Sequence, residues 1–416
     1  MGLLSSHSGS QRRGTLLACA FTACVLARGT PAGDWELAID LRAVQSVGRE
    51  SFLANGQGKL RYDADHEGIR LGRLRAAWNQ PLGDVFALHA EGSTWDDEDK
   101  APFDLTEAYL EYRPYPRAGL RTRLRLGAFY PPMSLESRAL GWETPYTITP
   151  SAIGAWIGEE IRTVGLEGQV DWLGTRLGHA FEVQLTAALF GWNDPAGTML
   201  GTHGFAFHDR QTTLFGRVGT YQPEPAEAKK ELFAEIDGRP GYYVGAQARY
   251  LDRAALNVLH YDNRGDPRAP APELRDFAWH TTFDAAALRV ETGGDWTLIL
   301  QALEGETLIW PSIWFDWKFE SRSALLARRF GAHMLAARYD EFGVRFSRPG
   351  FSAENESGHA WTAAWTYERA DPWRFALEWL RVSSRVRQRA RGLGEAPLAI
   401  ESKVELSARY TLRGQY

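Results

Sequence analysis

The sequence predicts an all-β fold, a transmembrane antiparallel β-barrel of 16 strands with short periplasmic turns and long extracellular loops. Three observations predict it. Apolar and polar residues alternate through segments of ten or more residues, and a tilted membrane-spanning strand needs about 9–11. The links between these segments are alternately short and long, which places tight turns at one rim and loops at the other. No stretch after residue 30 has about 18 consecutive apolar residues, so a membrane-spanning helix is not expected.

The chain begins with the pattern of an export signal. Two arginines precede an apolar run at 14–27, and small residues follow it. This order is typical of a signal peptide, with cleavage expected near Ala27 or Ala32. We therefore expect a signal peptide at 1–32 and a barrel at 33–416. An uncleaved anchor and a lipobox (Leu-Leu-Ala-Cys, inside the run) are the alternatives. Both cysteines lie in this segment, so the mature barrel would have no disulfide.

The composition fits a barrel with a wet interior. Mean hydropathy is −0.35, as expected if a polar lumen face dilutes an apolar outer face. The chain has 16 Trp, 15 Tyr and 20 Phe, which gather near segment ends, as in the aromatic girdles of membrane barrels. The formal charge is −5, and this acidic surplus argues against a nucleic-acid partner.

The alternation and the links together place the strands. We expect them at 34–47, 68–79, 85–95, 104–114, 120–130, 158–171, 179–192, 239–251, 254–263, 274–290, 295–305, 313–327, 331–345, 358–370, 373–387 and 398–416. An even count returns both termini to the periplasmic rim. Residues 211–221 also alternate, and we place them inside the long extracellular loop 193–238 to keep the count even.

The alternation also predicts which face of each strand meets lipid. In 312–322 the residues Ile313, Phe315, Trp317 and Phe319 take every second position, with charged residues between them. We expect this apolar row to face lipid and the charged row to face the lumen. The same rule places Phe283 outward.

Two motifs resemble a known family. The chain ends in "LSARYTLRGQY", where Tyr410, Leu412 and Tyr416 resemble the terminal assembly signal of outer-membrane barrels. The run "LGAFYPPMSLES" (126–137) resembles the strand-to-loop junction of the phosphate-selective porin O/P group. The positions that match are Gly127, Phe129, Pro132, Ser134, Leu135 and Glu136.

This resemblance implies a bacterial outer-membrane porin: a trimeric channel of 16 strands whose third long loop folds into the lumen. Members of that group select phosphate with arginine ladders and lysine clusters. This chain has six Lys. Loop 131–157 follows the fifth strand and is the candidate constriction loop, with Glu136, Arg138 and Glu143 as its charged residues. An ordinary surface loop over the mouth is the alternative.

Arginines on the predicted lumen face are the candidate selectivity residues. Strand parity and barrel closure bring eight of them to one arc of wall, with two glutamates between them: Arg42, Arg73, Arg75, Arg121, Arg123, Arg125, Arg409, Arg413, Glu107 and Glu111. They predict an electropositive path for small anions, since the local field counts and not the net charge. A salt-bridge ladder that only keeps the lumen wet is the alternative.

Four further arginines alternate at the start of the last long loop: Arg385, Arg387, Arg389 and Arg391. By parity they continue a lipid-facing row, and we expect them to contact lipid headgroups and lipopolysaccharide. A solvated basic loop is the alternative. We expect His203 and His208 to be surface residues without ligand spacing. The acidic loop 95–100 fits no calcium-loop template.

No catalytic motif stands out, so we expect no enzyme, no cofactor and no metal. The predicted function is passive diffusion of small hydrophilic solutes through an outer-membrane channel with a preference for anions. The alternatives are an enzyme on the barrel wall, and a structural or adhesive barrel whose loops, 193–238 among them, plug the bore.

Overall fold

The computed structural model describes residues 32–416 except 55, 97–102, 138, 220–228, 273–275, 311–314, 348–354, 370–371, 388 and 391–393. The predicted signal peptide therefore lies outside the described residues apart from Ala32, as do most of the acidic loop 95–100, Arg138 and Arg391. No helix of the described chain is long and apolar enough to cross a membrane.

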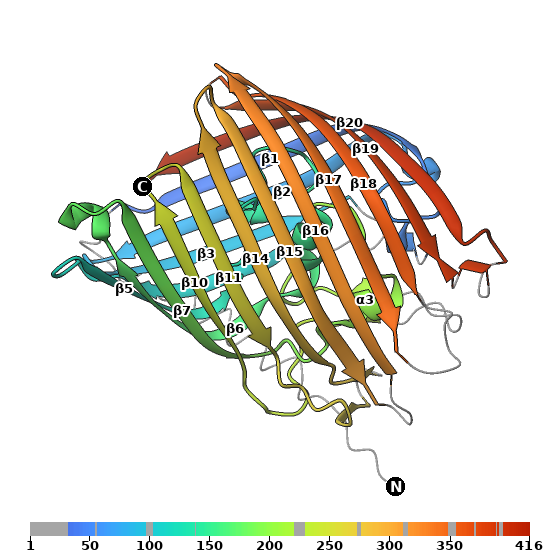
Figure 1. Ribbon diagram of the computed structural model, residues 1–416, viewed down its shortest axis with the longest axis horizontal. Helices are drawn as coiled ribbons and strands as arrows, with labels where there is room; N and C mark the ends of the chain where they lie inside the picture. Colours follow the sequence, from blue (N-terminus) through green and yellow to red (C-terminus); the bar gives the residue numbers. More distant parts are fainter. Residues whose placement is uncertain are drawn as a thin grey trace, which may run out of the picture.

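The prediction of a 16-stranded antiparallel barrel is confirmed. The strands pair in the order β1 (Asp34–Val47), β2 (Gly68–Leu82), β3 (Phe86–Thr94), β4 (Asp104–Tyr112), β5 (Leu120–Phe129), β6 (Thr163–Trp172), β7 (Phe181–Gly191), β10 (Gly241–Tyr250), β11 (Ala254–Asp262), β14 (His280–Thr292), β15 (Trp296–Ile309), β16 (Phe315–Phe330), β17 (His333–Phe346), β18 (Glu356–Tyr367), β19 (Trp373–Val386) and β20 (Leu398–Gln415). Figure 1 shows the long tilted strands β14–β18 side by side.

Closure leaves no free sheet edge. The first strand pairs with the last from Asp34↔Gln415 to Val47↔Ser402, and every described barrel strand has a neighbour on both sides. Hydrocarbon offers backbone groups no hydrogen bonds, so a closed ladder is what lets strands cross it. Of the segment 211–221, the described residues 211–219 join no barrel strand. Val218–Gly219 (β8) pairs instead with Lys229–Lys230 (β9) in the long loop.

Over most of the barrel the apolar row lies outward, as predicted. On β7 the outward side chains Phe181, Leu185 and Leu189 are more than half exposed, and the intervening residues are less exposed. On β20 the outward residues Val404 and Leu406 alternate with buried Glu405 and Ser407. One face of each strand thus meets lipid, and the other faces the lumen.

The predicted faces of 312–322 and 274–290 are wrong at their extracellular ends. Trp317 and Phe319 are buried inside, while Lys318 and Arg322 are exposed outside; Ile313 lies outside the described residues. Phe283 is also buried. The reason is that loops fill this part of the lumen and give apolar side chains a dry partner within. Trp317 stacks on Trp279 at 5.3 Å between ring centroids.

Candidate functional site

Three extracellular loops fold back into the barrel and occupy the upper lumen. Residues 48–67, 131–162 and 192–217 contribute most of the buried side chains that no strand supplies. They form one apolar cluster with the inner faces of the strands. We call these three loops the plug. An interior packed this way cannot be a wide aqueous bore.

A helix at the centre of the plug is buried on all sides. All nine residues of α2 (Ala152–Glu160) are buried, and the Ser151 hydroxyl caps the helix by accepting the Gly154 N–H at 3.1 Å. Trp156 anchors it to the strand wall, with ring centroids 5.4 Å from Phe283 and 5.2 Å from Phe319. The helix is therefore fixed by aromatic packing.

One ion pair ties loop 131–157 to β17. Glu136 and Arg338 lie 3.0 Å apart, both with side chains 0% exposed. Arg338 also pairs with Asp340 at 2.7 Å and donates to the carbonyls of Thr149 and Pro150, both at 2.8 Å. Charges this deeply buried are stable only when fully partnered, so Arg338 holds the loop at two points, Glu136 near its start and Thr149–Pro150 near its end.

A second ion-pair cluster ties the same loop to another part of the wall, at β2 and β20. Glu143 contacts Arg73 on β2 and Arg409 on β20 and lies 3.9 Å from Arg75. Burial alone would raise the pKa of Glu143, but these arginines lower it well below its ordinary range. The loop leaves β5, and Glu136 binds Arg338 on β17, which lies eight strands away in the closed order. The loop therefore lies across the lumen.

The remaining predicted arginines of this arc are also paired. Arg42 contacts Asp40 at 2.6 Å, Asp209 at 2.5 Å and Glu405 at 2.9 Å. Arg413 donates to Glu36 at 2.7 Å, and Arg75 contacts the same carboxylate. On this side the structure matches the salt-bridge alternative.

The arginines of β5 differ because they line open space. A cavity of about 390 Å³ lies between this strand and the plug, and Glu107, Arg121, Arg123, Arg125 and Arg249 are its charged lining residues. The carboxylates that pair with these arginines are set into the wall: Arg121 meets Asp171 at 2.6 Å and Arg125 meets Glu167 at 2.8 Å, and both acids are buried.

Arg123 is the least compensated of the three. Its closest partner is the neutral amide of Gln169, at 2.5 Å. Glu167 lies at 3.4 Å and Glu111 at 3.9 Å. Its Nε is buried without a hydrogen-bond partner. Glu107, the other predicted acid, accepts the Tyr130 N–H at 3.0 Å. The cavity therefore presents more positive than negative charge.

The arginines predicted to contact lipid headgroups divide into two groups. Arg385 and Arg387 are exposed, and their headgroup contact stays a prediction. The prediction for Arg389 is wrong. It is buried and donates to the carbonyl of Gln57 at 2.7 Å and the hydroxyl of Ser384 at 3.0 Å, because the chain leaves strand parity after Val386 and turns inward.

The prediction that His203 and His208 lie at the surface is also wrong. Both are buried, with the Phe52 ring 4.8 Å from His203 and 5.0 Å from His208 between ring centroids. His208 pairs with Glu159 of α2 at 3.1 Å. Burial lowers the pKa of His203 to about 4, so it is neutral at pH 7. Alternation could not predict this because the segment is an infolded loop.

Sequence reasoning missed Arg338, Asp340 and Glu160. Arg338 and Asp340 stand two residues apart in an otherwise apolar inward row, between Ala336 and Phe342, which was the available signal. Glu160 gave no signal, since only the infolding of its loop buries it. Its carboxylate accepts the Trp156 indole N–H at 2.5 Å and the N–H groups of Gly197 and Met199 at 2.9 Å, joining two loops of the plug.

Glu160 should make stability depend on pH. Burial raises its pKa to about 8, although the Met199 N–H and the Trp156 indole lower it. The folded protein thus holds a proton that the unfolded chain releases near pH 4.5, so stability should fall as pH rises from about 4.5 to about 8 and then level off. Urea midpoints between pH 4 and 9 measure this. Glu160→Gln should flatten the curve relative to Glu368→Gln, a control at a carboxylate that is 50% exposed, and an unchanged slope would contradict the assignment.

Comparison with known proteins gives the fold and no closer relationship. No known family model matches the sequence, and no curated protein matches it. Among solved structures, the outer membrane channel DcaP of Acinetobacter baumannii is 11% identical with a TM-score of 0.52, covering 91% of this chain and 96% of that one. OmpT of Vibrio cholerae, an outer membrane protein in its trimer form, is 12% identical with a TM-score of 0.50, covering 92% and 100%. The chain thus has the barrel fold of bacterial outer-membrane proteins.

Proposed function

We propose that this chain is a channel of the bacterial outer membrane for small hydrophilic solutes, and that it prefers anions. The observation that carries the proposal is the cavity beside β5, because it is polar, lies in the lumen and is lined by four arginines and one glutamate. A local surplus of fixed cations concentrates anions whatever the net charge of the chain. The outward apolar rows support a membrane location, and the trimer form of a protein with the same fold supports a homotrimer.

Reversal potentials in planar bilayers under a KCl gradient test the anion preference. We expect the wild type to favour chloride and Arg123→Gln to lower the ratio of anion to cation permeability by about sevenfold, because a change of roughly one kT in local potential alters each ion by about 2.7-fold in opposite directions. Arg413→Gln is the matched control, since that arginine lies at the rim and not in the cavity. Cation preference, unchanged in Arg123→Gln, would contradict the proposal.

A plugged structural or adhesive barrel is the second candidate, and the apolar cluster around α2 favours it. The two candidates differ in conductance. A channel passes ions in the folded, heat-modifiable form, whereas a plugged barrel passes none and does not let liposomes swell in sugars of any size.

We infer no enzymatic role for the outer wall. Ser383, His359 and Glu341 face outward in register on three neighbouring strands, but no hydrogen bond joins their side chains in the described structure. A nucleophile and its base must meet before proton transfer can occur. Purified protein should not hydrolyse phospholipid, and hydrolysis abolished by Ser383→Ala would reverse this inference.

A further inference from the structure

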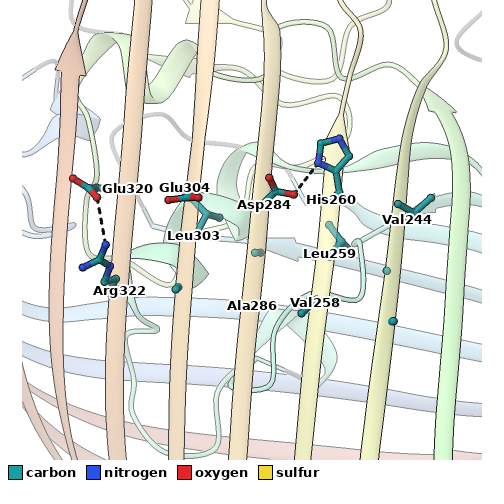
Figure 2. Close-up of a pocket in the computed structure, with 14 residues that line it drawn as sticks. Val244, Val258, Leu259, His260, Asp284, Ala286, Leu303, Glu304, Glu320 and Arg322 are labelled. Carbon is teal, nitrogen blue, oxygen red and sulfur yellow. Dashed lines mark hydrogen bonds and ion pairs between the residues drawn. The ribbon is translucent and has the colours of Figure 1, made fainter.

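A belt of charged residues interrupts the outer apolar surface of the barrel on β11–β19. His260, Asp284, Glu304 and Glu320 are register partners on four successive strands, and Figure 2 shows them in one row. Outward residues of the described strands β3–β10 carry no charge. The belt is therefore a local feature of one face.

The belt reaches down to the depth of lipid tails. On β14 three apolar outward residues, Ala286, Leu288 and Val290, separate Asp284 from the periplasmic end. Such a row spans only about 13 Å along the strand, against about 27 Å for the five apolar outward positions of β7. The hydrocarbon band of a barrel is about 25 Å tall, and charge inside it is destabilising. The face is consequently unsuited to direct contact with lipid tails.

The acidic and basic residues of the belt lie on different groups of neighbouring strands. The outward positions of β11–β15 carry four carboxylates and no Lys or Arg: Asp262, Asp284, Glu304 and Glu306. The outward positions in the upper half of β16–β19 carry five cations against three carboxylates: Lys318, Arg322, Arg345, Arg381, Arg385, Asp316, Glu320 and Glu341. We call these the acidic half and the basic half. Asp284 pairs with His260 at 2.8 Å and Glu320 with Arg345 at 3.5 Å. Glu304 lies between these two carboxylates in the register, has no ion pair in the described structure, and is therefore unfavourably placed without a partner from outside.

The shape of the outer wall also differs between the acidic half and the basic half. A cavity of about 680 Å³ indents the wall from β10 to β16, centred on the acidic half; small residues such as Ala286 and Ala302 line it below Asp284, Glu304 and Glu320. In the basic half Trp361 and Trp379 protrude, 51% and 41% exposed. On β14 and β15 the first outward residues below the charged belt are Ala286 and Ala302. On β18 and β19 the corresponding residues are Trp361 and Trp379. One half thus offers a recess and the other offers bulk at the same layer.

We infer that a second copy of this chain covers the belt, with the acidic half of one protomer against the basic half of the next. In a ring of copies whose symmetry axis runs along the membrane normal, each copy presents its left side to the right side of the next copy. This arrangement brings carboxylates to arginines and tryptophans to the recess. An anionic lipid headgroup would match the basic half but be repelled by the acidic half.

The spacing of the halves fits a closed trimer. Sixteen strands turn about 22° each, so the centres of the two halves, three to four strands apart, are separated by about 70–90° around the barrel axis. In a closed trimer the two contacts of each subunit lie about 60° apart. The inference deepens the homotrimer of the proposed function by naming its contact surface. Its test measures association, so the result does not depend on whether the lumen conducts.

Cross-linking tests the contact directly. The chain is expressed from residue 33, which removes both native cysteines, and carries Glu304→Cys with Arg381→Cys. A short bis-maleimide should link neighbouring copies into covalent species up to the trimer. The control pair, Leu189→Cys with Val404→Cys, lies outward on β7 and β20 and should leave monomer. Linkage through the control pair alone would overturn the inference, and so would a wild type that light scattering in mild detergent shows to be monomeric.

Charge reversal provides a second, independent test. Asp284→Lys with Glu304→Lys should reduce the particle from three chains to one, and Arg322→Glu with Arg345→Glu should do the same. All four substitutions together should restore the trimer, since both halves are then reversed. Heat-modifiable migration confirms that each variant is folded. Trimers that persist in both reversed pairs, or a fourfold variant that stays monomeric, would reject the contact.

Discussion

Replacing Arg338 by Ala should release the loop across the lumen and raise single-channel conductance several-fold. The substitution leaves Glu136 and Asp340 buried without a counter-ion, and breaking one partner of such a pair costs about 3–5 kcal/mol. It also removes the donors to Thr149 and Pro150. The backbone hydrogen bonds of the barrel are unchanged. We therefore expect the loop to move, because its movement removes the cost of burying two unpaired carboxylates.

Conductance in planar bilayers measures this release. Arg328→Ala is the control, since that arginine lies on the neighbouring strand β16 but on the outer wall, over the rings of Trp296 and Phe330 and away from the charged residues of the extracellular half. An Arg338→Ala protein that is folded and conducts like the wild type would show that the loop does not limit passage.

Trp156→Ala should produce the largest loss of stability. Its ring is 3% exposed and contacts the rings of Phe205, Phe283 and Phe319, and truncating a buried aromatic costs about 3–5 kcal/mol. The substitution also removes the indole N–H that donates a hydrogen bond to Glu160. We expect a lower urea midpoint and faster proteolysis within 131–162 while the barrel persists.

Trp35→Ala serves as the comparison, because that side chain lies on the outer wall at β1, away from β11–β19, and is 39% exposed. Its unfolding midpoint should change little in detergent. Equal losses of stability in the two variants would mean that the packing around α2 contributes no more to the stability of the fold than a side chain on the outer wall.

The barrel could be predicted from the sequence because period-two alternation and link length are local signals. They located all 16 strands and the even count, and they placed residues such as Leu189 and Val404 outward. Parity also brought Arg42, Arg73 and Arg409 to one side of the lumen, where Glu143 joins two of them. These inferences needed only the geometry of a strand.

The contents of the lumen could not be predicted in the same way. Alternation says that two faces differ, and it does not say which one is dry. Lipid surrounds most of the wall, but the plug supplies a second dry environment inside, so Trp317 and Phe319 turn inward at the extracellular end. The burial of His203 and Arg389 likewise depends on contacts between segments far apart in the chain, and no local pattern encodes them.

The central claim is that alternate residues of one strand face water inside and lipid outside, beside a passage that ions use. Two neighbouring positions of β5 test it most directly, as Arg123→Cys and Leu124→Cys in the chain expressed from residue 33. Conductance is recorded while a charged, membrane-impermeant thiol reagent is added. We predict that modification at 123 lowers the current and shifts its ion preference, whereas position 124 stays inert. Reaction at 124 with none at 123, or no current from either folded protein, would contradict the account.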